Sequence, residues 1–452
     1  MKTKILSLLL ATASSLAFAQ SPILDSYIQE GLKNNLQLKQ EQLNYERSIE
    51  NLAQAKSLFL PYVGANATYQ YADGGRKISI PIGSLMNPVY DNLNALNGPS
   101  APQYSHISNA TTNFLATDFH DTKLRVIQPL FNPEIYFNYK AQKELVTVQQ
   151  AQKKTYENQL KYEITSAYFQ YLQSDEALRI LKNTYSILRE LLKINQSLVA
   201  NAKATKDVVL NTEYELNKIE QQIADNEKNN QVAQAYFNFL LNREMNASIE
   251  RDSTLVVTGN EQQEISSLTN TALQQRQELL QLQNGIRANQ QLISLSKGNA
   301  YLPKINVVGD AGYQGFYYKF NNDQKYWLVQ FGLTWDIFKG GEKRAKTQQA
   351  RIDYQVTENK MEQLKKQIEL QVIQSHYEFE AAKQAYKASQ SGVKSAEKSF
   401  QIIRAKYNEG QAILLEYLDA QNKYTTSQLT NSINQYELLR KSAALQKTIN
   451  NL

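Results

Sequence analysis

The fold follows from the stretch YWLVQFGLTWDIF, residues 326–338, in which apolar and polar side chains alternate. Every second residue forms one large apolar face: Trp327, Val329, Phe331, Leu333, Trp335 and Ile337. A period of two predicts an extended strand. In water this face needs a packed partner, as in the core of a soluble sandwich, whereas in a membrane barrel it contacts lipid directly. We interpret the stretch as a membrane strand.

The two tryptophans of the chain support this interpretation. Trp327 and Trp335 lie on the same face, about 26 Å apart along a strand that rises about 3.3 Å per residue. Tryptophan is enriched where a barrel meets the two membrane–water interfaces. We therefore expect Trp327 and Trp335 to be membrane-interface residues.

Three further stretches also alternate. A strand at about 303–318 precedes the first stretch, and its polar face carries Lys304, Asn306 and Asp310, which we expect to point into a barrel lumen. The N-terminal half has corresponding strands at about 61–71 and 114–131. The connection between them, about 72–112, is rich in Gly and Pro, which predicts a polar loop.

Long helices account for the rest of the chain. Residues 134–258 contain neither Pro nor Gly, and residues 342–452 contain only Gly392 and Gly410. Apolar residues recur every seven positions, as in Tyr386, Val393, Phe400 and Tyr407, which is typical of coiled-coil packing. We expect helical hairpins at about 134–245 and 340–450, with long helices of roughly 100 Å at 1.5 Å per residue.

The chain repeats itself. In residues 20–250 and again in 251–452, the pattern predicts helix, strand, strand, long helix, turn and helix, and Leu60-Pro61 corresponds to Leu302-Pro303. We expect these repeats to fold together rather than as independent domains. A single chain then has four membrane strands, too few to close a barrel, and unpaired strand edges in lipid cost several kcal/mol per group. Several copies must therefore pool their strands.

Composition excludes most chemistry. The chain has no Cys and three His, so a thiolate or His-based catalytic or metal site is not expected, and we expect no enzyme and no cofactor.

Residues 1–19 are typical of a signal peptide, with a basic start, a short apolar core and Ala17-Phe18-Ala19 before the cleavage site. Without Lys2 and Lys4 the formal charge of +6 falls to 6 − 2 = +4, too weak to indicate nucleic acid.

The chain resembles the TolC family of outer-membrane channel proteins over essentially its whole mature length. The resemblance rests on the duplicated segments before each strand pair and on the strand exits Gln128-Pro129-Leu130-Phe131-Asn132 and Asp336-Ile337-Phe338-Lys339-Gly340-Gly341. The strongest motif is residues 407–421, YNEGQAILLEYLDAQ, which is similar to the helix-turn-helix tip of that family.

The resemblance implies a mainly α fold with a membrane β-barrel portion. Three chains with four strands each would build a twelve-stranded barrel continuous with a long α-helical barrel. The implied function is the outer-membrane channel of a tripartite efflux or type I secretion system, a passive conduit that extends into the periplasm. The implied partners are a homotrimer, a periplasmic adaptor protein, an inner-membrane pump of RND, ABC or MFS type, and outer-membrane lipid.

Acidic residues at the second tip are candidates for a pore gate. Glu416 and Asp419 are three residues apart, so they share a helix face, and three chains would bring six carboxylates to one level. A ring of acids favours cations and can constrict a pore. Acids in the first turn of a helix also interact well with its dipole, which is the simpler interpretation. In the family, acidic residues at the matching positions line the closed entrance.

Two more residues join the gate hypothesis. Asp207 lies at the turn of the first hairpin, and Tyr407 could hold a closed tip by hydrogen bonding, although it is also a seam position of the heptads. Ala412 stands where some relatives carry a basic partner. The adaptor is expected to contact the two tips, about 201–208 and 407–415, through Ala202, Ala204, Lys206, Gly410, Gln411 and Ala412.

Two other classes of protein compete with a channel. One is a trimeric coiled-coil surface or adhesive protein anchored by a small barrel, but such proteins carry one barrel segment at the C-terminus and do not duplicate it. The other is a soluble periplasmic enzyme, which the absence of Cys, the scattered His and the lack of a Gly-rich phosphate loop disfavour.

Overall fold

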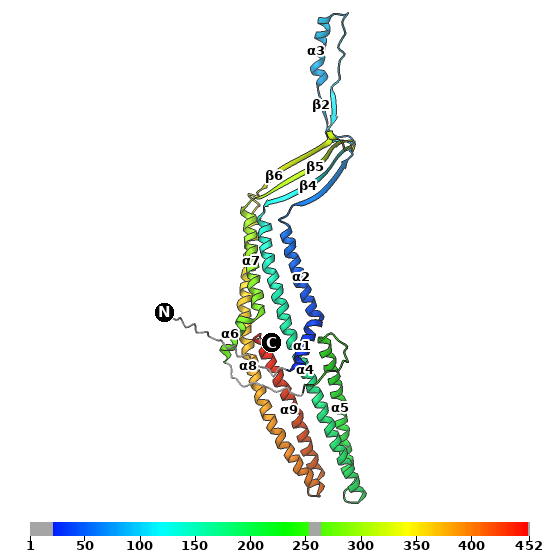
Figure 1. Ribbon diagram of the computed structural model, residues 1–452, viewed down its shortest axis with the longest axis vertical. Helices are drawn as coiled ribbons and strands as arrows, with labels where there is room; N and C mark the ends of the chain where they lie inside the picture. Colours follow the sequence, from blue (N-terminus) through cyan, green and yellow to red (C-terminus); the bar gives the residue numbers. More distant parts are fainter. Residues whose placement is uncertain (1–20, 253–263, 451–452) are drawn as a thin grey trace, which may run out of the picture. The chain divides into compact units, whose positions relative to one another are not determined.

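The computed structural model describes residues 21–252 and 264–450, and the expected signal peptide at 1–19 lies outside them. These residues form a mainly helical protein with a small antiparallel sheet (Figure 1). Among them, no helix combines the length and apolar character needed to cross a membrane. The chain divides into two compact units, Met1–Glu50 with Lys143–Ala288 and Ile352–Leu452, and Asn51–Gln142 with Asn289–Arg351. Each unit therefore draws segments from both halves of the sequence.

The second unit contains a four-stranded sheet in the order β1-β4-β5-β6. Its strands are antiparallel and run over Tyr62–Gln70 (β1), Phe119–Phe131 (β4), Lys304–Phe316 (β5) and Lys325–Thr334 (β6). Strands from both halves of the sequence thus share one hydrogen-bonded sheet.

Two of these strands are shorter than the sequence pattern predicts. The strand expected at 326–338 ends at Thr334, which pairs with Lys304, because the preceding Pro303 has no N–H to continue the ladder. The strand expected at 114–131 begins at Phe119, opposite the last residue of β1, because Asp118 leaves the extended region with a φ of 52°.

The connection between β1 and β4 is not the polar loop that we expected at 72–112. It holds strand β2 (Lys77–Ile80), helix α3 (Ile82–Asn97) and strand β3 (Ala110–Asn113), with β2 and β3 paired. The prediction of a loop was wrong because it treated every Pro as a helix breaker. Pro81 stands immediately before the first residue of α3, where its missing N–H costs nothing, and only Pro88 lies inside the helix.

The four-stranded sheet has one apolar and one polar face. Trp327, Phe331 and Leu333 are 78%, 74% and 65% exposed in the single chain. On the opposite face Arg125 donates to both carboxylate oxygens of Asp310, at 2.8 and 2.7 Å, and Tyr326 donates to Asp121 at 2.8 Å. The period-two pattern thus separates an uncovered apolar surface from a hydrogen-bonded polar one.

The helices begin and break at polar residues of the repeat. Helix α1 (Pro22–Asn34) starts after Ser21, whose hydroxyl accepts from the Leu24 N–H at 3.0 Å, and α2 (Leu36–Ser57) follows a break at Asn35. The second half has the same break at Arg276, between α6 (Ile265–Gln275) and α7 (Gln277–Tyr301). At both breaks the backbone is extended and its N–H bonds back to the preceding turn.

Two helical hairpins follow the strand pairs. The first joins α4 (Pro133–Ala200) to α5 (Asp207–Leu240), and the second joins α8 (Glu342–Asn408) to α9 (Leu414–Thr448) (Figure 1). Helices α4 and α8 have 68 and 67 residues, so each is roughly 100 Å long at 1.5 Å per residue. The near absence of Pro and Gly in these stretches predicted such helices: α4 has only Pro133 at its start, and α8 has only Gly392.

An aromatic core anchors the N-terminal helices on the first hairpin. Tyr168 and Phe237 are fully buried there with Leu160 and Ile164. The Tyr168 hydroxyl donates to the Glu250 carbonyl at 2.9 Å and accepts from the Asp252 N–H at 3.0 Å. Burial raises the pKa of Tyr168 to about 12.

Tyr168 predicts a loss of stability in alkali. Its folded-state pKa lies above the unfolded value of about 10, so its contribution is complete below pH 10 and is lost as the pH rises toward 12, by up to about 1.4 kcal/mol per pH unit. We expect Tyr168→Phe to be less stable near neutrality, by about 1–3 kcal/mol, but to lose less stability between pH 9 and 12. Chemical denaturation followed by circular dichroism measures both, with the exposed Tyr214→Phe as the control. An unchanged alkaline slope in Tyr168→Phe would contradict the assignment.

Candidate functional site

The two hairpin tips have the same backbone geometry. After α4, the N–H groups of Ala202 and Lys203 bond to the carbonyls of Val199 and Leu198 at 3.0 and 2.8 Å. After α8, those of Gly410 and Gln411 bond to Tyr407 and Lys406 at the same two distances. Ala202 and Gly410 have φ values of 53° and 76°. Each tip therefore ends its long helix with a left-handed residue and a paired cap.

The expected adaptor-contact residues lie on these turns. Ala202, Lys206, Gly410 and Gln411 are exposed, whereas Ala204 and Ala412 are half-buried. The structure thus places four of the six predicted contact residues on the open surface of the tips, and their contact with an adaptor stays a prediction.

Beneath the tips the two hairpins share one core. It contains Leu181, Leu188 and Leu191 of α4, Leu216 and Ile219 of α5, Phe400 of α8, and Leu414, Tyr417 and Ala420 of α9. The Phe400 ring meets the Tyr417 ring edge-on at 5.4 Å, and the rings of Tyr407 and Tyr417 lie 5.2 Å apart. Heptad residues singled out in the sequence therefore hold the hairpins together.

Tyr407 links the second hairpin to the first. Its hydroxyl donates to Asn195 Oδ1 at 2.6 Å, and Asn195 Nδ2 donates to Thr212 Oγ1 at 2.8 Å. Asn195 and Thr212 are fully buried. Burial raises the pKa of Tyr407 above its ordinary value, so its hydroxyl keeps the donating proton at physiological pH. Asn195 was not predicted, because its partner lies 212 residues away in sequence.

An ion pair also joins the hairpins. Arg404 of α8 lies 3.0 Å from Glu190 of α4. This pair was not predicted from the sequence, and position 412, where some relatives carry a basic partner, is Ala. Both residues flank heptad seam positions, Ile403 on one helix and Leu188 and Leu191 on the other, and charges flanking a seam commonly pair across it. The position of both charges beside seam residues was therefore the signal in the sequence that could have predicted the ion pair.

The acidic candidates do not form one network within the chain. Glu416 Oε2 accepts from the Ile413 N–H at 3.0 Å and so caps the start of α9, and Asp419 lies 2.7 Å from Lys423. Asp207 accepts from the Thr205 hydroxyl in its own turn. Glu416, Asp419 and Asp207 are exposed. In the described single chain Glu416 thus caps the first turn of α9, and a role of these acids in a gate stays a prediction.

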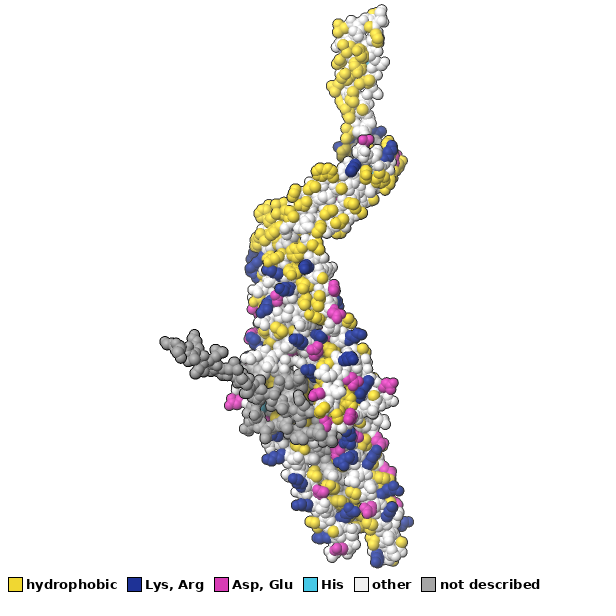
Figure 2. Space-filling view, viewed as in Figure 1, with side chains coloured by type: hydrophobic (Ala, Val, Ile, Leu, Met, Phe, Trp, Pro, Cys, Tyr) yellow, Lys and Arg dark blue, Asp and Glu magenta, His cyan; other side chains and the backbone are white. Residues whose placement is uncertain are grey.

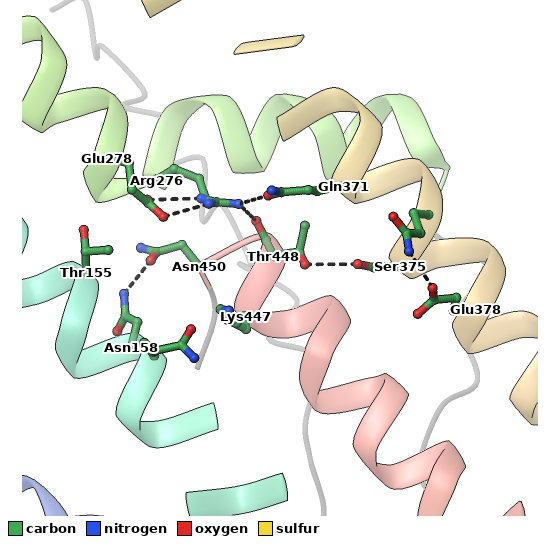
Figure 3. A pocket seen from close by; sticks show the side chains of 12 residues that line it. Thr155, Asn158, Arg276, Glu278, Gln371, Ser375, Glu378, Lys447, Thr448 and Asn450 are labelled. Atoms are coloured by element: carbon green, nitrogen blue, oxygen red, sulfur yellow. Dashed lines mark hydrogen bonds and ion pairs between the residues drawn. The ribbon is translucent and has the colours of Figure 1, made fainter. Parts of the chain in front are cut away.

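A polar cavity of about 270 Å³ lies farther from the tips, between α4, the α6–α7 break, α8 and α9 (Figure 3). Arg276 lines this cavity. Its guanidinium donates to both oxygens of Glu278, at 2.7 and 3.1 Å, and to Gln371 at 2.9 Å. Although burial alone would raise the pKa of Glu278, the Arg276 guanidinium lowers it overall. Through these hydrogen bonds Arg276 holds the α6–α7 break against α8 and, by a bond to the Thr448 carbonyl, against α9.

Within residues 21–252 and 264–450, no cluster of His, Asp or Glu could hold a metal ion. The chemistry of the tips is therefore that of exposed carboxylates, a capped turn and hydrogen bonds between the hairpins.

The matched tips give a stability prediction. Ala202 holds a left-handed conformation that costs a non-Gly residue about 1 kcal/mol, and Gly410 holds it without that cost. We expect Ala202→Gly to stabilise the protein by up to about 1 kcal/mol and Gly410→Ala to destabilise it by a similar amount. Thermal unfolding compares the two variants with wild type. Two shifts of the same sign would show that the turns are not equivalent.

Comparisons with known proteins agree with this geometry. The family model described as outer membrane efflux protein matches residues 268–451. No curated protein matches the sequence. Among solved structures, the chain is similar to the outer-membrane channel OprN, with 14% identity over 96% of this chain and 91% of that one and a TM-score of 0.77.

Two further channels are similar to the same extent. The CmeC outer-membrane channel of Campylobacter jejuni is 16% identical, with 95% of this chain and 85% of that chain covered and a TM-score of 0.75. The MtrE outer-membrane channel of Neisseria gonorrhoeae, solved in its open state, is 15% identical, with 95% and 89% covered and a TM-score of 0.75. The expected mainly helical, TolC-like fold and the resemblance to that family are confirmed.

Proposed function

We propose that this chain belongs to the outer membrane efflux protein family, whose model matches residues 268–451, and is one subunit of an efflux channel in the outer membrane. The observation that carries the proposal is the four-stranded sheet, whose uncovered face is apolar and whose other face is polar. Such a sheet is a sector of a membrane barrel with lipid outside and water inside. The comparisons support the role, since the family and the similar structures are outer-membrane channels.

The channel is a homotrimer. In the described sheet β1 and β6 each pair on one side only, which leaves two open edges per chain. If β6 of one copy pairs with β1 of the next, three copies close a barrel of 3 × 4 = 12 strands, and no edge is left in lipid. Trp327 and Trp335, 78% and 52% exposed in the single chain, then lie at the membrane interfaces.

The lumen of this barrel is lined by the polar face. Asp310 pairs with Arg125 there, and Lys123 pairs with Asp121, so the charges balance. A neutral, hydrogen-bonded lining suits a passive conduit that does not select its cargo by charge, and we assign no catalytic step to the chain.

The helical tips meet the other parts of the system. Their exposed small and polar residues suit a periplasmic adaptor, which would connect the channel to an inner-membrane pump of the RND, ABC or MFS type. The protein would thus extend from the outer membrane into the periplasm.

The proposal is tested with purified full-length protein. We expect a trimeric mass in detergent and single channels in a planar bilayer. A monomer would overturn the shared barrel. A trimer without conductance under any voltage or pH would favour the adhesive, coiled-coil alternative.

The acidic residues are tested without disturbing the helix start. Glu416→Gln keeps an oxygen that can accept from the Ile413 N–H, and Asp419→Asn removes the second charge. If six carboxylates form a gate in the trimer, the double variant raises conductance and brings the cation-to-anion permeability ratio toward one. Glu213→Gln, at an exposed position of α5 outside the contacts that join the hairpins, controls for a general loss of charge. A double variant with wild-type conductance and selectivity would remove both residues from the gate.

Tyr407 tests closure of the tips. Tyr407→Phe removes the bond to Asn195 and keeps the aromatic packing. The loss is about 1 kcal/mol per chain, and if three chains open together the closed state loses about 3 kcal/mol, or roughly two orders of magnitude in population. We expect a higher open probability in bilayers, with the exposed Tyr377→Phe as the matched control. Equal open probability in the two variants would assign Tyr407 to packing alone.

A further inference from the structure

Helix α3 is pinned along one side to the segment that returns from it. Asn87 Nδ2 donates to the Ile107 carbonyl at 3.0 Å, and the Ile107 N–H donates back to Asn87 Oδ1 at 2.9 Å. One heptad later, Asn94 makes the same pair of bonds with Tyr104, at 2.8 and 2.7 Å. These amides bond to the backbone of the return segment as a neighbouring strand would.

Further contacts fix the same side. The Ser84 N–H donates to Asn109 Oδ1 at 2.9 Å, and Asp91 Oδ1 lies 2.7 Å from His106 Nε2. At Gly83 a Cβ would lie 2.1 Å from the Ile107 carbonyl oxygen, so only glycine allows this approach. Residues 84, 87, 91 and 94 follow the three-and-four spacing of one helix face. The polar side chains on this face of α3 therefore all have partners in the return segment.

The opposite face is apolar and uncovered. It consists of Ile82, Leu85, Met86, Val89, Leu93 and Leu96, which we call the α3 stripe and which are between 37% and 83% exposed. At 100° per residue these six side chains fall within about 100° of the helix circumference. Figure 2 shows apolar side chains gathered along this part of the chain. Ile82, Val89 and Leu96 are seven residues apart, the spacing of a coiled-coil seam.

The charge of the segment indicates what covers the stripe. Residues 78–115 contain no Lys or Arg, and their one acid, Asp91, is paired on the other face. An anionic lipid headgroup finds no cation there. Copies of the same segment, by contrast, approach one another without bringing like charges together.

The topology brings copies to one place. Segment 71–118 leaves β1 and enters β4, so it lies at the strand ends remote from α2 and α4. In the proposed trimer, three such segments rise from the same rim of the shared barrel. The trimer thus brings three copies of α3 to one rim, where each apolar seam finds identical partners.

We propose that the α3 stripes of three subunits pack on one another as a three-helix coiled coil at the outer end of the barrel. The inference rests on the proposed trimer and adds a closure at the strand ends remote from α2 and α4. Its core layers are Ile82, Val89 and Leu96, with Leu85, Met86 and Leu93 filling the spaces between them.

Single cysteines test this packing, because the chain has none of its own. Val89→Cys places a thiol in the stripe, and Ala95→Cys places one on an exposed position of another side of α3. In trimers verified by mass, mild oxidation should join Val89→Cys subunits as covalent dimers, since a disulfide requires Cα atoms within about 7 Å. Ala95→Cys should stay monomeric on a denaturing gel.

The outcomes separate the inference from the proposed function. Verified trimers without cross-linking at position 89, or with equal cross-linking at 89 and 95, would overturn the coiled coil and leave the channel intact. If spin-labelled lipid in vesicles quenches a fluorescent probe attached to the thiol of the Val89→Cys variant, the coiled coil is also overturned, in favour of a membrane contact. A sample that never forms trimers would overturn the proposed function itself.

A second variant tests the closure. Val89→Glu with Leu96→Glu brings like charges to the seam, and we expect trimers of unchanged mass with a higher single-channel conductance. The control Ala95→Glu with Ser105→Glu adds the same charge at exposed positions outside the stripe, on another side of α3 and on the return segment, and should conduct as wild type. Equal conductance of the two double variants would overturn the closing role of α3.

Discussion

The unsatisfied edges of one small sheet determine how copies of this chain must assemble in the proposed channel. Each backbone N–H and C=O group needs a partner where water is absent, and β1 and β6 lack one on their outer sides in the described chain. Four strands cannot curl far enough to pair these edges with each other. The proposed assembly of identical subunits follows from this requirement.

The helical part obeys a different constraint. Helices of this length are not stabilised by their own propensity, so they depend on packing along their sides. The core shared by α4, α5, α8 and α9 supplies it, and buried polar contacts fix the register of the two hairpins, as between Thr184 and Thr425 at 2.8 Å. Tyr407 and Arg404 add links on the same surface. Heptad spacing thus provides affinity between hairpins, and polar pairs provide their alignment.

How much could be predicted from the sequence depended on the range of the interaction. Period-two alternation and the lack of breakers are local signals, and they located the four strands of the sheet and the long helices to within a few residues. Ends set by a partner were missed: β6 stops at Thr334 because Pro303 ends the neighbouring ladder, although the alternation continues to Ile337. Helix α3 was hidden because Pro81 and Pro88 were counted as breakers without regard to position. At the tips the turn itself was predicted, but Asn195 and Glu190 were not, since their partners are more than 200 residues away.

The equal caps at Ala202 and Gly410 have a consequence for symmetry. The two turns share their hydrogen bonds but not their side chains, so a ring of three subunits, as in the proposed trimer, would present six similar loops of two alternating kinds. The backbone of such a ring is close to sixfold symmetric, whereas its side chains have only threefold symmetry. A docking protein that recognises backbone shape can therefore seat six copies on it, whereas one that recognises side chains finds only three sites.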